Sequence, residues 1–400
     1  MKLTPKLIIS LVITFFLSGG LAYAIVPTGG GALISPKTEI TTEKKSAGFS
    51  QFAAEPKTEA CPLNGKLYSK SEKTLWEARR PILTMLENHV EARPQSGLSY
   101  ADIVYEAVAE GGITRFMGVF YCGAQGDSAK VGPVRSARIY FVNIAAEYNT
   151  PVYMHVGGGN CSAEQPGGPC TSNKKAQALE ELAKLGWRKA GGNDFDTISD
   201  IGYPVLFRDY NRLGVDKVLA TEHTMVGSLP SAWKEALKRG YAGTDEKGKT
   251  WISGLKLWKI GSENLKGKSA QNISYEFWKG YKDFTVDWKY DPATKEYLRS
   301  QGGAIQVELE TTKQITTSNV IVQFAKEEGP LDVHKHMFYT VTGDGTGIFF
   351  SNGQAIDIKW KKAKQTDRTI FTDMTGKEIS FTPGAIWISI LPIGNKVEYN

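Results

Sequence analysis

The chain has 400 residues, of which 41% are hydrophobic, 11% aromatic and 22% charged, as in an ordinary globular protein. Its formal net charge is +6 at pH 7, which permits contact with an anionic envelope surface but falls short of the basic footprint of a nucleic-acid-binding protein. We therefore expect no nucleic-acid partner. The length exceeds what one hydrophobic core usually holds, so it predicts two folded domains.

Residues 1–26 predict a signal peptide or an N-terminal membrane anchor. Lys2 and Lys6 precede the uncharged apolar run 7–17, and Ala22-Tyr23-Ala24 then supplies the small-x-small pattern that signal peptidase requires. The alternative is an uncleaved anchor, because about 20 uncharged residues suffice to cross the hydrocarbon core as a helix. Lysines ahead of the apolar run place the N-terminus inside. Both alternatives predict an extracytoplasmic protein, secreted or anchored by its N-terminus, whose membrane contact lies in this segment.

Two segments with different patterns follow the N-terminal segment. Residues 27–60 are rich in Gly, Thr, Ser, Lys and Glu without apolar periodicity, which predicts a flexible linker. Residues 61–244 mix strand and helix patterns and predict an α/β domain. Within it, two β-prone runs flank Gly111-Gly112 and predict a hairpin, and a buried strand is expected over 151–156. Helices are expected over residues 138–148 and 174–185 and after Ser231.

The last part of the chain, residues 245–400, contains short β-prone runs separated by turn signals. Aromatic and β-branched residues alternate with polar ones, as in half-buried antiparallel strands, and residues 343–347 and 351–353 predict tight turns. We therefore predict an α/β N-terminal domain followed by a mostly antiparallel β C-terminal domain, a barrel or a sandwich, which is α+β overall. The expected strands are 273–278, 285–290, 304–310, 319–325, 337–341, 347–351, 355–360 and 385–391.

All four cysteines lie in the part that would be exported: Cys61, Cys122, Cys161 and Cys170. An even number in an oxidising compartment favours disulfides, and three connectivities are open. We expect the pairs Cys61–Cys122 and Cys161–Cys170. Because no C-x-x-C pair occurs, we expect no structural zinc, and no other pattern calls for a metal or a cofactor.

The segment 132–138 (GPVRSAR) is the strongest candidate for chemistry, since it directly precedes a predicted helix. Free backbone N–H groups at a helix start, with the planar fork of arginine beside them, suit a phosphate or a carboxylate. We predict an anion-binding site formed by Arg115, Arg135, Ser136 and Arg138. The alternative is that Arg135 and Arg138 pair internally with local acids such as Glu106, Glu110 or Glu147.

A second group of candidates follows the buried strand 151–156. His155 ends that strand, and Gly157 and Gly158 would allow a ligand to approach the backbone closely. The alternative for His155 is a structural histidine. Three further ligand-binding candidates would join this set if the loops converge: Arg208, Arg212 and His223.

Several motifs, in this order, resemble the YerB family of bacterial proteins, which are described as lipoproteins with a two-part domain of unknown function. The motifs are residues 93–98 (RPQSGL), 101–106 (ADIVYE), 110–116 (EGGITRF), 132–138 and 155–158 (HVGG). The resemblance covers about residues 75–225, and a weaker second part runs from about 275 to 395, where residues 319–322, 343–347 and 383–384 carry it.

The resemblance implies a bacterial envelope location and supplies no established catalytic residues. The chain departs from the family pattern in two places. No cysteine precedes Cys61, so the chain lacks the early cysteine that would carry a lipid. Glu222-His223-Thr224 stands where relatives often have Pro-His-Asn, so the histidine persists but the asparagine amide does not.

These patterns support three hypotheses about function. The first is a non-catalytic binding or accessory module for an anionic envelope ligand or an envelope protein, with arginines supplying charge-assisted bonds. The alternative is a hydrolase or transferase acting on cell-wall glycans or phosphodiesters through the Arg/His cluster. The third is a structural protein that contacts its partner through the β-rich domain. An enzyme would gather a histidine, a carboxylate and the arginines around one cleft, and since neither G-x-S-x-G nor H-E-x-x-H occurs, we assign no catalytic residue.

Overall fold

The computed structural model of the chain describes residue 52 and residues 54–126, 128–159, 173–261 and 265–400. All of these belong to one compact unit. The predicted signal or anchor segment, residues 1–26, and most of the predicted linker lie outside the described residues. Within the described ranges, no helix is long and apolar enough to cross a membrane.

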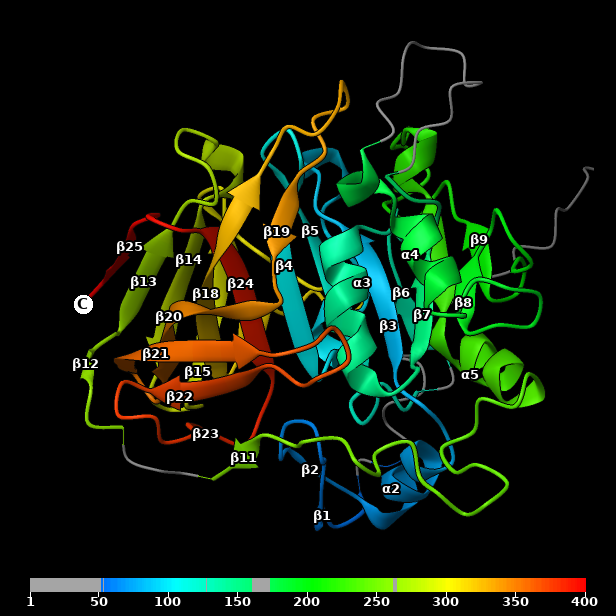
Figure 1. The fold of residues 1–400 in the computed structure, drawn as a ribbon, viewed down its shortest axis with the longest axis horizontal. Helices are drawn as coiled ribbons and strands as arrows, with labels where there is room; N and C mark the ends of the chain where they lie inside the picture. The colour runs from blue at the N-terminus through cyan, green and yellow to red at the C-terminus, as the bar shows by residue number, and fades with distance from the viewer. Residues whose placement is uncertain (1–51, 53, 127, 160–172, 262–264) are drawn as a thin grey trace, which may run out of the picture. The chain divides into compact units, whose positions relative to one another are not determined.

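A mixed sheet of twelve strands runs through the structure (Figure 1). The N-terminal half of the chain supplies one end of this sheet, in the order β4 (Ile103–Glu110), β5 (Ile113–Phe120), β3 (Ile82–Glu87), β7 (Val152–His155) and β8 (Asp194–Asp196). The other end comes from the C-terminal half, in the order β12 (Lys268–Ser269), β21 (Gln354–Lys362), β20 (Gly343–Ser351), β18 (Asn319–Glu328) and β24 (Ile386–Pro392). Two further strands attach at its sides, β19 (Phe338–Thr340) to β18 and β22 (Ile370–Asp373) to β21.

Strand β24 joins the two halves of the sheet. It pairs in parallel with β18 on one side, where Asn319 lies opposite Ile386, and in parallel with β4 on the other, where Ile386 lies opposite Ile103. Figure 1 shows the red β24 directly beside the cyan β4. The predicted fold class, mixed α/β in the N-terminal region and mainly β in the C-terminal region, is confirmed. Backbone hydrogen bonds nevertheless cross between the two regions, and the boundary near residue 245 stays a prediction.

A second, antiparallel sheet of six strands comes entirely from the C-terminal region. Its strands are β13 (Asn272–Tyr275), β14 (Val286–Asp291), β15 (Glu296–Gln301), β16 (Ala304–Ile305), β17 (Thr316–Thr317) and β25 (Val397–Tyr399). Small sheets complete the set of strands: β1 (Glu59–Ala60) with β2 (Leu67–Tyr68), β6 (Lys130–Val131) with β10 (Met225–Ser228) and β9 (Leu206–Arg208), and β11 (Lys259–Ile260) with β23 (Ser380–Phe381).

The α-helices of the described residues precede residue 245: α2 (Lys70–Glu77), α3 (Ile139–Ala145), α4 (Ala178–Lys184) and α5 (Leu229–Lys238). The three predicted helices are present, and α3 and α4 are shorter than expected because 3₁₀ turns occupy Ala146–Tyr148 and Lys174–Ala176. Helix α5 starts earlier than predicted, since the hydroxyl of Ser228 caps it by accepting the N–H of Ser231. Helix α2 was not predicted, although Ser69 and Glu72 form a capping box at its start.

Two turn predictions in the C-terminal region had different outcomes. The turn at 351–353 is confirmed between β20 and β21, with positive φ at Asn352 and Gly353. Residues 343–347, predicted as a turn, instead form the start of strand β20. Glycine is needed there for packing, because a Cβ on Gly345 would lie 2.6 Å from the indole nitrogen of Trp360.

The predicted disulfide Cys61–Cys122 is confirmed, with Cα atoms 6.0 Å apart. Beside it lies Asp102, whose carboxylate accepts the N–H groups of Tyr121 and Cys122 at 2.8 Å. Burial raises the pKa of Asp102 to about 6 against the effect of these bonds. The predicted pair Cys161–Cys170 lies outside the described residues.

A fully buried ion pair, Glu106–Arg299, holds the two sheets together. Glu106 lies on β4 and Arg299 on β15, and both side chains are completely inaccessible to solvent. The Arg299 Nη2 atom donates to Glu106 Oε2 at 2.8 Å, and the indole of Trp387 on β24 donates to the same oxygen at 3.1 Å. This carboxylate therefore connects the large sheet to the antiparallel one.

We expect Glu106→Gln to lower the free energy of unfolding by about 3–5 kcal/mol, because Arg299 would keep its buried charge without a partner. Urea denaturation followed by circular dichroism measures the change. The control is Glu77→Gln, which removes a surface pair with Lys73 at 4.0 Å and should cost at most about 1 kcal/mol. Equal losses in the two variants would contradict the role assigned to the buried pair.

Candidate functional site

The carboxyl ends of β3, β7 and β8 meet at one edge of the large sheet, because β7 pairs in parallel with both of its neighbours. The segment 132–138 crosses this edge. The N–H of Arg135 donates to the Met85 carbonyl, and the N–H of Ala137 donates to the Gly157 carbonyl, each at 2.9 Å. The loop predicted as an anion site and the glycines after β7 are therefore direct neighbours.

Arg115 and Arg138 share one carboxylate, that of Glu110. Arg115 Nη2 lies 2.5 Å from Glu110 Oε1, and Arg138 Nη2 lies 2.5 Å from Glu110 Oε2. Burial would raise the pKa of Glu110, but the two guanidinium groups lower it to about 2. The arginine side chains are only 1% and 6% exposed. The internal pairing considered as the alternative for Arg138 is therefore present, and Arg115 shares the same carboxylate.

His155 is fully buried, and both of its ring nitrogens are engaged. Nε2 lies 2.5 Å from Asp194 Oδ1, and Nδ1 lies 2.7 Å from the Gly157 carbonyl. Burial opposes the charged imidazolium, yet the bond to Asp194 raises the pKa of His155 above its ordinary value. Arg188 completes the cluster with ion pairs to Asp194 at 2.7 Å and to Asp196 at 2.9 Å.

The glycines after β7 are bonded to the protein itself. The N–H of Gly157, which has a φ of +67°, donates to Asp196 Oδ1 at 2.9 Å. Gly158 forms a parallel bridge with Ala137. The predicted role of these backbone groups in ligand binding stays a prediction.

A third cluster gathers around Glu87, the last residue of β3. Arg135 Nε lies 3.0 Å from Glu87 Oε1, and His223 Nδ1 lies 2.8 Å from Glu87 Oε2. Arg135 is 29% exposed, whereas His223 is only 5% exposed. The structure thus brings Arg135 and His223 together, as the hypothesis of converging loops predicted, but through a carboxylate that the sequence analysis did not consider.

Arg208 and Arg212 bind backbone carbonyls around this cluster. Arg212 donates to the carbonyls of His223 at 2.7 Å, Pro94 at 2.9 Å and Ala92 at 2.5 Å, and burial lowers its pKa to about 10. Arg208 donates to the Thr221 carbonyl at 2.5 Å. Both arginines therefore fix the segments that surround Glu87. Ser136 contributes its carbonyl oxygen, which accepts a bond from Arg115 at 3.2 Å.

Two groups of residues among the described ones have the composition of a metal-ligand set. The first, Cys61 with Asp102 and Cys122, has its two cysteines joined in the disulfide and so offers no thiolate. The second is His223 with His89 and Glu91 from the segment after β3, and the donor atoms of these three side chains lie within 4.8 Å of one another. The sequence signal for this ligand set was a histidine between two carboxylates, in the run Glu87-Asn88-His89-Val90-Glu91. This signal was not used in predicting the site.

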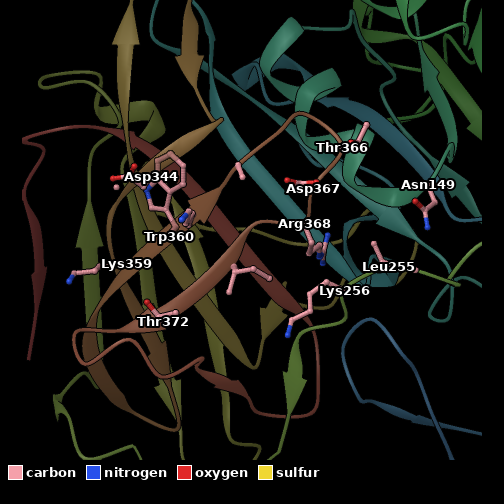
Figure 2. A pocket seen from close by; sticks show the side chains of 15 residues that line it. Asn149, Leu255, Lys256, Asp344, Lys359, Trp360, Thr366, Asp367, Arg368 and Thr372 are labelled. Carbon is pink, nitrogen blue, oxygen red and sulfur yellow. The ribbon is translucent and has the colours of Figure 1, made fainter.

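A hollow with a volume of about 600 Å³ lies elsewhere, on the β20–β21–β22 side of the large sheet. Figure 2 shows side chains reaching it from separate stretches of the chain, among them Lys256, Asp367 and Arg368. Apolar groups of Leu255, Trp360 and Ile370 line it together with the cations Lys256, Lys359, Lys361 and Arg368 and the anions Asp344 and Asp367. None of the site residues predicted from sequence belongs to this described lining.

A buried ionic cluster forms the wall of this cavity. Glu147, completely buried after α3, pairs with Lys362 at 3.0 Å and with Arg368 at 3.2 Å. Arg368 also lies with its guanidinium 3.6 Å from the ring centre of Trp258. The loop that bears Arg368 is thereby fixed against the N-terminal half of the chain.

Comparison with known proteins matches both halves of this architecture. The family "Protein of unknown function (DUF3048)" matches with its N-terminal domain at residues 67–200 and with its C-terminal domain at residues 273–388. The fold and these matches define the class, a two-part protein of unknown function, and the chain belongs to the DUF3048 family.

A relative in this family carries a name and a solved structure. The chain is 29% identical over 331 residues to "Putative lipoprotein YerB" of Bacillus subtilis (strain 168), covering 83% of this chain and 86% of the relative. The crystal structure of the Bacillus subtilis YerB protein aligns at 26% identity with a TM-score of 0.65, over 85% of this chain and all of that one. The resemblance predicted from the motifs is therefore confirmed.

The Glu110 cluster predicts a specific dependence of stability on pH. A carboxyl whose pKa is about 2 in the folded protein, against an ordinary value of 4.5, adds roughly 3 kcal/mol at neutral pH, at about 1.4 kcal/mol per pH unit. Because the folded pKa is lowered, this contribution is complete above pH 4.5 and is lost as the pH falls towards 2. We expect Glu110→Gln to be less stable than the wild type by about 3 kcal/mol at pH 6 and by roughly 1 kcal/mol at pH 3.

Denaturant titrations at these two pH values measure the difference. Glu77→Gln, which changes an exposed carboxylate, serves as the matched control and should show a small difference that hardly changes with pH. A Glu110→Gln difference of the same size at both pH values would mean that this carboxylate is not held ionised by the two arginines.

Proposed function

We propose that this protein is an exported bacterial envelope protein that binds an anionic envelope ligand without catalysing a reaction on it. Export is supported by the signal-like segment 1–26, by the Cys61–Cys122 disulfide, which suits an oxidising compartment, and by the lipoprotein name of the relative. The N-terminal segment would leave the protein either secreted or held at the membrane.

The observation that carries the binding role is the 600 Å³ cavity of Figure 2, which combines apolar walls with a surplus of cations. Cavities of this size and lining are typical of small-molecule sites. Lys256 already pairs with Glu378 at 2.9 Å, and Arg368 pairs with Glu147. The exposed lysines Lys359 and Lys361 make no ion pair within 4 Å to any described residue, so their charge is available to a ligand.

The ligand class follows from this lining. A phosphate or carboxylate head would lie near Lys361, and an apolar body would pack against Trp360, Leu255 and Ile370. The described lining contains neither histidine nor cysteine, the side chains that most often serve as a general base or a nucleophile near neutral pH. At the other edge of the sheet, Arg115, Arg138 and His155 each form an ion pair with a carboxylate of the protein itself, so their charges are already compensated. Both observations favour binding over the hydrolase or transferase alternative.

Isothermal titration of the purified full-length protein tests this proposal, with farnesyl diphosphate as a probe that has an anionic head and an apolar body. We expect Lys361→Glu to raise the dissociation constant at least tenfold, because a charge-assisted hydrogen bond contributes about 1.5–3 kcal/mol and 1.4 kcal/mol is a factor of ten. Inorganic diphosphate and farnesol alone should each bind more weakly than the intact probe.

The matched control is Lys364→Glu, an equal change of charge at an exposed lysine that does not line the cavity. Binding by this variant should equal that of the wild type. If the wild type takes up no probe, or if both variants weaken binding equally, the cavity is not the proposed anion site.

A further inference from the structure

His223 and two residues after β3 bring three metal-binding groups together from distant parts of the sequence. Glu91 Oε2 lies 3.5 Å from His223 Nε2 and 3.9 Å from His89 Nδ1. The two imidazole rings are stacked, with ring centres 5.2 Å apart and planes 13° from parallel. Each side chain therefore offers one donor atom, and the three atoms lie within 4.8 Å of one another.

The hydrogen bonds show that neither of these nitrogens carries a proton. Glu87 accepts from His223 Nδ1 at 2.8 Å, and since an ionised carboxylate can only accept, Nδ1 carries the proton and Nε2 of the neutral ring is free to bind a metal. His89 Nδ1 accepts the backbone N–H of Glu91 at 3.3 Å, so this nitrogen is unprotonated, and its lone pair reaches an ion once His89 turns away from this long hydrogen bond. A metal-binding histidine whose other nitrogen donates to a carboxylate is the usual arrangement around zinc.

The distances fit a transition-metal ion with little movement. Zinc binds histidine nitrogen at about 2.0–2.1 Å and carboxylate oxygen at about 2.0–2.2 Å, so two ligand atoms of a tetrahedral ion lie roughly 3.4 Å apart. The observed separations of 3.5 and 3.9 Å exceed this value by about 0.1 and 0.5 Å, and the two histidine nitrogens lie within 4.8 Å of each other, so a modest approach of the side chains would hold an ion. Two histidines and one carboxylate also form a ligand set that leaves a fourth position open.

The surroundings fix the two ligand-bearing segments. Glu91 lies in the 3₁₀ turn Val90–Ala92 and His223 in the 3₁₀ turn Thr221–His223. Arg212 bonds the carbonyl of Ala92 and that of His223, so one guanidinium ties the two turns together. The opposite side is open, since the side chain of Glu91 is 68% exposed and that of His89 is 32% exposed. An ion could enter from solvent without unfolding the site.

We propose that His89, Glu91 and His223 form a binding site for a divalent transition-metal ion of the zinc class, with Glu87 orienting His223 from behind. No metal was predicted from the sequence, because the three ligands are brought together only by the fold. In the competing arrangement, His223 is doubly protonated and forms a purely structural ion pair with Glu87 and Glu91. This site lies outside the cavity proposed above, so either proposal can fail alone.

Titration of metal-free, full-length protein with Co²⁺ tests the proposal, because cobalt reports its coordination through visible d–d absorption and replaces zinc with similar ligands. We expect the absorption to saturate at one equivalent and to be displaced by Zn²⁺. Glu91→Gln should raise the dissociation constant for Co²⁺ at least tenfold, because it removes a direct ligand. Loss of a residue that only orients a ligand already lowers metal affinity by about 10–100-fold. Because the Glu91 side chain is exposed, we expect this substitution to leave the fold intact, and circular dichroism checks this.

Two variants control for neighbouring donors. Glu222→Gln neutralises the exposed carboxylate next to His223, and His334→Asn removes a histidine from the separate pair His334 and His336. Both should bind Co²⁺ as the wild type does. The proposal is overturned if the wild type gives no d–d band, if Glu91→Gln binds with unchanged affinity, or if His334→Asn abolishes binding.

Discussion

The buried pair of Glu106 and Arg299 is the constraint on which the architecture depends. A carboxylate and a guanidinium that are wholly removed from water are tolerated only when each is neutralised and hydrogen-bonded. Glu106 finds those bonds on β15, through Arg299, and on β24, through the indole of Trp387. Arg299 in turn lies against aromatic faces, 4.3 Å from the ring centre of Trp387 and 5.0 Å from that of Trp288. Strand β4 is thus stable only with the C-terminal strands in place.

The same logic shapes the cavity. Glu147 is buried on the N-terminal side, and its two partners, Lys362 and Arg368, lie at the end of β21 and in the loop after it. Burial lowers the pKa of Lys362, while Glu147 acts to keep it charged. The loop between these cations is also bonded to α3 and α4, because the amide of Gln365 donates to Asn143 at 2.8 Å and to Glu181 at 2.7 Å. The wall of the cavity is therefore set by contacts between the two halves of the chain.

Local sequence patterns predicted the strands and turns that depend on residues close together in the chain. Alternating apolar residues located most of the C-terminal strands, and Gly111-Gly112, both with positive φ, correctly marked the β4–β5 hairpin. The patterns could not predict that β24 inserts between β18 and β4, because alternation specifies which face of a strand is buried and says nothing about its partner. For the candidate site, Glu110 was considered as an internal partner of Arg138, whereas Glu87 as the partner of Arg135 and His223 was not considered.

Arg115 and Arg138 are weak candidates for binding an external anion, because their charges are already compensated by Glu110. An external anion at Arg115 or Arg138 would have to displace Glu110 from two contacts of 2.5 Å and reach guanidinium groups that are almost inaccessible. That displacement would leave a buried carboxylate without a partner, at a cost of several kcal/mol. Lys361 and Glu91 are exposed groups whose charge has weaker internal compensation, so a ligand gains their interaction without breaking the core. Ligand binding in this fold is therefore favoured at exposed charged groups on the surface, rather than at the buried ion pairs.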